Sequence, residues 1–235
     1  MEKKGELLAG FPAERPPTDT LKRMVTEVQE SWERLATWFE THAPHVRARL
    51  AEPATDADLR AVEQAHGVAL PADLAQSWQC FNGVLDGRGD TASIYPGGCY
   101  PASTHGAIKN LASSARTIAL ASGQDPNEDQ ILADVANDLA GETTEDVWAH
   151  PPSWIVISED PDRLFIDCRR GPRQGCVMKM FHEGGQLGPL WPSIAAMLAE
   201  TAEILESIDV AARPSIVTYS GGQWHIPTSW WQPST

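Results

Sequence analysis

The stretch that decides the fold runs from Trp32 to Gly83 and reads WERLATWFETHAPHVRARLAEPATDADLRAVEQAHGVALPADLAQSWQCFNG. Its first part belongs to a longer pattern, because apolar residues recur every three or four positions from Leu21 to Phe39. That spacing places them on one side of an α-helix and leaves the intervening charges facing water. Pro44 makes continuation costly, so we expect this helix to end before it.

Two further helices are predicted by their capping residues. Thr55 with Asp58 three positions later predicts a capped helix start, because each side chain can bond the backbone N–H of the other residue. Gly67 predicts the end of that helix, since glycine adopts the left-handed conformation without steric strain. Pro71 predicts the first position of a third helix, where its missing N–H has no partner in any case. Asn82-Gly83 would end the third helix.

Later apolar segments predict strands and a closing helix. In chain order the motifs are Trp32-x-x-Leu35, Pro44, Leu50-x-x-Pro53, Leu59-x-x-Val62-Glu63, His66-Gly67-Val68-x-Leu70-Pro71, Asn82-Gly83, Ile155-Val156-Ile157, Leu164-Phe165-Ile166-Asp167, Gly175-Cys176-Val177 and Trp191-Pro192-Ser193-Ile194-Ala195-Ala196-Met197-Leu198. Together, over about residues 32–200, they resemble the SUKH superfamily, which includes the yeast-type Smi/Knr regulators of cell-wall synthesis and many bacterial immunity proteins. The chain departs from that pattern by an insertion at about 118–152. It also has Glu159-Asp160-Pro161-Asp162 where the family more often has a small glycine-containing turn.

The predicted fold class is α+β, with a mostly antiparallel or mixed sheet packed with N-terminal and C-terminal helices, SUKH-like as the resemblance implies. The expected strands cover about 92–96, 154–158, 163–168 and 176–181, with a further hairpin near the C-terminus and a closing helix over 192–207. Three regions are expected: an extension and helix start over 1–31, the SUKH-like domain over 32–207, and a C-terminal hairpin and tryptophan-rich tail over 208–235.

Length and composition fit a single globular domain in the cytoplasm. The 235 residues are 42% hydrophobic, and no apolar run approaches the roughly 20 residues that a membrane helix needs. The first residues contain too little apolar sequence before Pro12 to form the core of a secretory signal. We therefore expect a cytoplasmic protein with no membrane partner.

Cysteine and histidine usage predicts neither a disulfide framework nor a metal site. Four cysteines are few for this length, although Cys168 and Cys176 flank a turn between expected strands, where a cross-strand pair is conceivable. We favour reduced thiols. The seven histidines are scattered, and Pro44 breaks the helix that would align His42 with His45. The sequence therefore predicts that the chain folds without metal or cofactor.

Charge is the second informative feature. The chain has 32 acidic and 18 basic residues, a formal net charge of −14, and no Lys or Arg between Arg116 and Arg163. Such a surface repels phosphate backbones and attracts basic proteins at a rate that falls with salt. The more common explanation of such acidity is a solvated insertion that only aids solubility, and an acidic docking surface is the alternative to it. Residues 127–140 are expected to form an amphipathic helix with its carboxylates outward.

Partner-binding residues are predicted from this charge and from the aromatic residues. The acidic candidates are Asp134, Asp138, Glu159, Asp160 and Asp162, and the anchoring candidates are Tyr95, Tyr100 and the terminal Trp224, Trp230 and Trp231. The tryptophans could instead fix the tail onto the domain, which is the commoner role of such an extension.

A search for catalytic motifs finds no nucleophile elbow, phosphate-binding glycine loop or zinc-binding helix motif. Asp167 at a strand end is the one carboxylate that we single out, and a cap on neighbouring turn amides is its favoured interpretation.

The leading hypothesis is a non-catalytic immunity protein that binds a basic toxin domain, expected to be a nuclease, and does not itself bind nucleic acid. A regulator or scaffold of cell-wall synthesis or signalling is the alternative, and an enzyme of unrecognised type is the third.

Overall fold

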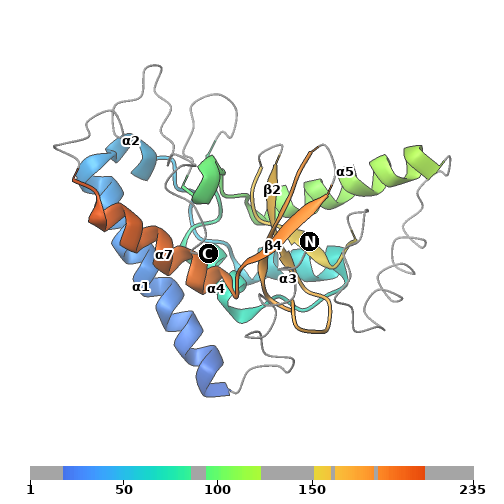
Figure 1. The fold of residues 1–235 in the computed structure, drawn as a ribbon, viewed down its shortest axis with the longest axis horizontal. Coiled ribbons are helices and arrows are strands. Elements are labelled where there is room, and N and C mark those ends of the chain that lie inside the picture. Colours follow the sequence, from blue (N-terminus) through green and yellow to red (C-terminus); the bar gives the residue numbers. More distant parts are fainter. Residues whose placement is uncertain (1–17, 86–93, 123–150, 160–161, 183–184, 210–235) are drawn as a thin grey trace, which may run out of the picture.

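The computed structural model describes residues 18–85, 94–122, 151–159, 162–182 and 185–209, which form an α+β fold (Figure 1). The helices are α1 (Thr18–His42), α2 (Pro44–Arg47), α3 (Asp56–His66), α4 (Ala72–Cys80), the 3-10 turn η1 (Pro96–Gly98), α5 (Thr104–Ser122) and α7 (Ile194–Ser207). The strands are β1 (Trp154–Val156), β2 (Arg163–Asp167), β3 (Val177–Met180) and β4 (Gln186–Trp191). The predicted fold class is confirmed.

The predicted helix boundaries hold where the signal is local. Ala43 leaves helical geometry at φ −144°, and Pro44 begins the short α2. At the start of α3, the Thr55 hydroxyl accepts from Asp58 N at 3.2 Å and the Asp58 carboxylate accepts from Thr55 N at 2.8 Å. Gly67 closes α3 with φ +66°. The capping box and the glycine stop are therefore confirmed.

The third predicted helix is shorter than expected at both ends. Pro71 is the N-cap of α4 and not its first helical residue, because its ψ of 137° is extended. Phe81 also lies outside the helix, with φ −147°, and packs edge-on against Trp32 at 5.2 Å between ring centroids. Gly83 follows with φ +79° against the backbone of Ser103, where a Cβ atom would come within 2.6 Å of the Ser103 nitrogen. Only glycine fits that contact.

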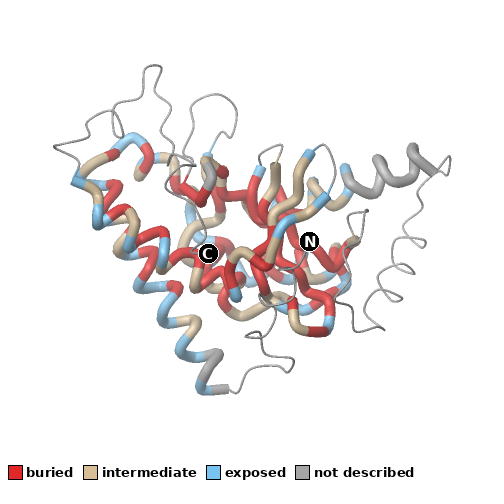
Figure 2. The backbone as a smooth tube through the Cα atoms, in the orientation of Figure 1, coloured by how far each residue is buried: buried red, intermediate tan, exposed pale blue. Residues whose placement is uncertain are grey.

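The sheet is antiparallel throughout, in the order β1-β2-β3-β4. Side chains alternate across it, so one face carries Ile155, Ile157, Leu164, Ile166 and Val177, and these join the main core with residues of α1, α3, α4, α5 and α7. Figure 2 shows this buried layer between the helices and the strands. The opposite face carries a smaller buried cluster in which the Trp154 and Phe165 rings stack at 4.2 Å.

Several expectations about the elements need correction or lie outside the described residues. The strand expected over 92–96 is not part of the sheet in its described residues; Tyr95 makes only an isolated bridge with Cys99 around η1. Neither β4 at 186–191 nor most of α5, over 104–117, was expected from the sequence. The predicted helix over 127–140 and the C-terminal hairpin lie outside the described part of the chain.

The closing helix is confirmed as α7, which packs along α1 and against α4. Its first turn is capped by the Ser193 hydroxyl, which accepts from Ala196 N at 3.1 Å, and by the buried carboxylate of Asp73 from α4. Among the described helices, none is long and apolar enough to span a bilayer.

Candidate partner-binding surfaces

The structure brings three of the ten predicted partner-binding residues into one region. Tyr100 and Glu159 lie where the segment after η1 runs beside the end of β1, and the backbone oxygen of Asp162 accepts from the Cys99 thiol, just before Tyr100, at 3.8 Å. We call Tyr100, Glu159 and Asp162 the acidic edge. The other candidates, apart from Tyr95, lie outside the described residues: Asp134, Asp138, Asp160, Trp224, Trp230 and Trp231. Tyr95 is near the acidic edge in the chain, but its side chain is in the core.

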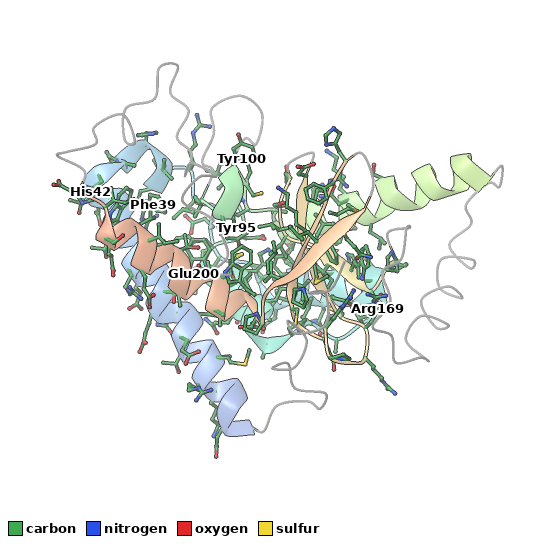
Figure 3. The ribbon with its side chains drawn as sticks, viewed as in Figure 1. Phe39, His42, Tyr95, Tyr100, Arg169 and Glu200 are labelled. Carbon is green, nitrogen blue, oxygen red and sulfur yellow. The ribbon has the colours of Figure 1, made fainter. Side chains whose placement is uncertain are left out.

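Backbone contacts hold the two segments of the acidic edge together. Glu159 N donates to Tyr100 O at 3.0 Å, and Ala102 N donates to Ile157 O at 2.8 Å. An isolated antiparallel bridge joins Pro101 to Ser158 between them. These backbone bonds place the half-buried Tyr100, labelled in Figure 3, next to the exposed Glu159.

Glu159 also lies at the beginning of α5. Its carboxylate lies against Gly106, where a Cβ atom would touch it, and Gly106 N donates to the Ser103 hydroxyl at 3.0 Å. The first turn of a helix stabilises nearby negative charge. The charge of Glu159 is therefore well accommodated while its side chain remains exposed.

Two basic residues, His182 and Lys179, contact the Asp162 carboxylate. Its carboxylate accepts from His182 Nδ1 at 2.9 Å and from His182 N at 3.1 Å, and Lys179 Nζ lies 3.5 Å away. The hydrogen bond from the His182 side chain lowers the pKa of Asp162. Asp162 therefore stays ionised, but its neighbours offset part of its field.

Tyr95 lies in the core beneath the turn that leads to Tyr100. Its side chain is 3% exposed, its ring centroid lies 6.4 Å from that of Trp32, and burial raises the pKa of its phenol. Reciprocal backbone bonds to Cys99, at 3.0 and 3.2 Å, close the turn that leads to Tyr100. A direct contact between the Tyr95 ring and a partner would require the core to open.

Asp167 is enclosed at the end of β2, where it caps a turn as the favoured interpretation expected. Its carboxylate accepts from Arg169 N at 3.0 Å and forms a two-pronged ion pair with the Arg169 guanidinium, with a shortest distance of 2.6 Å. Both side chains are 1% exposed, and the guanidinium lies 5.2 Å from the Trp154 ring centroid. This carboxylate is out of reach of any substrate and has a structural role.

The cysteine thiols and His66 give no sign of a reactive site in the described residues. All four cysteines are free thiols, and burial raises the pKa of Cys168 and raises that of Cys176 to about 12. His66 is buried, and its Nδ1 lies 2.7 Å from Pro152 O. Within the described ranges, no group of three or more His, Cys, Asp or Glu side chains could hold a metal ion.

A second surface was not predicted from the sequence. A hollow of about 600 Å³ opens along the seam between α1 and α7, and we call it the α1–α7 groove. Glu30, Glu33, Thr37, Trp38 and His42 of α1 line it together with Glu206 of α7. The lining residues of α1 recur every three or four positions, which is a signal that the sequence does contain. The sequence does not show that α7 forms the other wall.

Comparison with known proteins agrees with this architecture. The family model described as SMI1 / KNR4 family (SUKH-1) matches residues 53–200, from the loop before α3 to the middle of α7. A search of the curated proteins finds no match. Because the family model covers more than half of the sequence and includes the whole sheet, the chain belongs to the SMI1 / KNR4 family (SUKH-1).

Proposed function

We propose that this chain is a non-catalytic, protein-binding immunity protein that acts in the cytoplasm and neutralises a basic toxin domain, expected to be a nuclease. Family membership supports a role in protein–protein interaction. The toxin role is the more specific step, and it is supported by the charge of the chain.

The observation that carries the proposal is the position of the acidic edge on a chain with a formal net charge of −14. Glu159 is exposed beside the half-buried Tyr100, so a charge and an aromatic ring are presented together. A nuclease holds nucleic acid through a basic cleft. A surface that imitates the charge of phosphates can occupy such a cleft, with charges speeding association and aromatic anchors slowing dissociation.

We extend the proposed binding surface to Asp134, Asp138 and Asp160, which come from the region without Lys or Arg. Exposed charges act mainly through long-range steering. These residues can therefore contribute to the association rate even without a direct contact. Tyr95 contributes by holding the turn before Tyr100.

The test begins with the genes beside the gene for this chain, where we expect a toxin gene with a variable C-terminal domain. Co-expression should restore growth of cells that produce the toxin domain. In purified form, the variants Glu159→Gln/Asp162→Asn and Asp134→Asn/Asp138→Asn should associate more slowly than wild type at low salt, with a flatter salt dependence and little change in dissociation.

The charge-matched control is Glu40→Gln/Glu52→Gln, which removes two exposed carboxylates away from the acidic edge. Its association rate should remain close to that of wild type. Unchanged rates in both acidic variants would reject the acidic surface, and failure of the chain to bind or neutralise the toxin would reject the immunity role.

The Smi/Knr name of the family favours a second function, regulation or scaffolding of cell-wall synthesis. The two functions differ in gene context and in partner. A neighbouring toxin gene supports immunity, whereas a cell-wall enzyme recovered with the natively purified chain supports the regulatory role.

A further inference from the structure

An ion pair between Arg34 and Glu206 joins the two walls of the α1–α7 groove. Arg34 Nε donates to Glu206 Oε1 at 2.9 Å, and Arg34 Nη2 donates to Glu206 Oε2 at 2.6 Å. The hydrogen bond with Glu206 raises the pKa of Arg34, and it lowers the pKa of Glu206. Among the described residues that line the groove, the one guanidinium is therefore already paired with a carboxylate.

The remaining polar groups along α1 offer acceptors. The Thr37 hydroxyl donates to Glu33 O at 2.8 Å, and the Thr41 hydroxyl donates to Thr37 O at 3.0 Å. Each hydroxyl hydrogen is thus directed at the helix backbone, which leaves the oxygen lone pairs for another donor. Glu30 and Glu33 are exposed, and an ionised carboxylate only accepts hydrogen bonds.

Aromatic rings complete the lining. Trp38 is 7% exposed, and its ring centroid lies 4.9 Å from that of His42, with the planes tilted by 48°. Figure 3 shows His42 at the end of α1, close to the end of α7. Because Trp38 is buried behind it, the half-buried His42 ring is the aromatic surface that a partner can reach, and a planar guanidinium stacks on aromatic rings.

The occupant of this groove must therefore bring hydrogen-bond donors and positive charge. Three carboxylates, from Glu30, Glu33 and Glu206, face a single guanidinium from Arg34, and Glu203 adds to the negative field around Arg34. A guanidinium has five N–H donors, no acceptor and a flat apolar face. An ammonium has the charge but lacks the flat face.

We infer that the α1–α7 groove is a receptor for an arginine side chain of a basic partner protein. The inference rests on the proposed function only in that the partner is a basic protein. It assigns to α1 and α7 a second contact surface, separate from the acidic edge and made of described residues alone.

The probe is the peptide acetyl-Arg-Gly-Arg-amide, titrated into the ¹⁵N-labelled full chain while the backbone amides of residues 30–42 are followed by NMR. The matched peptide carries citrulline, which has nearly the same shape but no charge. The arginine peptide should shift the groove amides, an equivalent lysine peptide should bind more weakly, and the citrulline peptide should leave these amides in place.

The variant Glu30→Gln/Glu33→Gln should weaken binding of the arginine peptide about five-fold, the effect of removing two exposed ion pairs. Both residues are exposed, so the variant should fold like wild type. The control Glu40→Gln/Glu52→Gln removes the same charge outside the groove and should keep the wild-type affinity. Equal binding of the arginine and citrulline peptides, or unchanged affinity in the groove variant, would overturn the inference.

Arg213 of this chain follows α7 and is the competing occupant. If Arg213→Gln alone shifts the groove amides and strengthens peptide binding, the groove belongs to the chain's own arginine and the partner assignment is wrong. The titration requires no toxin. Its failure therefore rejects the groove, whereas failed co-expression rejects the toxin role.

Discussion

Trp78 shows how one side chain can join three parts of this molecule. It lies on α4, is 2% exposed, and belongs to the main core with residues of α1 and the sheet. Its indole N–H donates to Ala102 O at 2.9 Å, on the segment that leads into α5. The helical spacing of Leu74 and Trp78 predicts this burial, but the hydrogen bond depends on a contact 24 residues away.

Replacing Trp78 by Ala should lower the free energy of unfolding by about 3–5 kcal/mol, because a large buried ring is lost and a cavity remains. Urea denaturation monitored by far-UV circular dichroism measures the change. Trp78→Phe keeps an aromatic ring and loses the N–H donor with only part of the volume, so it should cost clearly less. A loss below about 1 kcal/mol for the alanine variant would contradict the burial of this ring.

The Asp167–Arg169 pair provides a second prediction at the scale of single residues. Arg169→Met leaves the Asp167 carboxylate buried without its cation and should cost about 3–5 kcal/mol of unfolding free energy. Asp167→Asn/Arg169→Met removes both charges and should be more stable than the single Arg169 variant. Thermal and urea unfolding of the three proteins measure the order, and a double variant less stable than the single one would contradict the argument.

At the scale of elements, the sequence predicts best what local chemistry determines. Thr55, Asp58 and Gly67 fix the ends of α3 through contacts within a few residues, so the prediction holds. By contrast, β4 contains Gly188 and Pro189, and in a sequence these two residues together predict a loop. The strand forms because β3 pairs with it and because a sheet edge tolerates proline. Its existence depends on a partner that the local sequence does not reveal.

The start of α7 allows a prediction about a contact between two helices. Asp73 of α4 is buried, and one of its carboxylate oxygens accepts from Ile194 N at 3.1 Å and from Ala195 N at 3.4 Å, while the other accepts from Leu74 N at 3.0 Å. Asp73→Ala removes acceptors for backbone groups of two helices and should cost about 2 kcal/mol.

Ser193→Ala is the matched comparison, because the Ser193 hydroxyl caps the same helix through Ala196 N alone. It should cost about 1 kcal/mol. Urea unfolding of both variants gives the two values. If Asp73→Ala costs no more than Ser193→Ala, the junction between α4 and α7 does not depend on this carboxylate.

At the scale of the whole molecule, the candidate surfaces are only partly predictable. The charge of −14 and the separate acidic and aromatic residues are visible in the sequence. Their grouping is not, because Tyr100 and Glu159 are 59 positions apart and are brought together by backbone bonds between their segments. The α1–α7 groove likewise needs two helices from opposite ends of the domain.

Metal independence is a prediction for the whole chain. Treatment with a chelator should leave the melting temperature unchanged, because the histidines are scattered in the sequence and predict no converging ligands. Metal analysis of the treated protein confirms that any metal has been removed. A decrease of several degrees, reversed by adding one metal ion, would contradict this prediction.

The change of the unfolding free energy with pH should depend on His66, which joins α3 to the segment before β1. His66 ends α3, and its Nδ1–H donates to Pro152 O, just before β1. Burial lowers the pKa of His66 below its ordinary value of 6.5 in the folded chain. The unfolded chain therefore binds a proton on this residue at a higher pH than the folded chain does. The contribution of His66 to the free energy of unfolding is therefore fully present above about pH 6.5. It is lost as the pH falls toward the lower pKa of the folded chain.

Urea unfolding at several pH values between about 7.5 and 5 measures this effect. Wild type should lose stability over this range, and His66→Gln, which does not titrate, should lose less. The exposed His45 provides the control, since His45→Gln should keep the wild-type slope. The slope and not the absolute stability is decisive, because a slope unchanged in His66→Gln would mean that other groups cause the acid sensitivity.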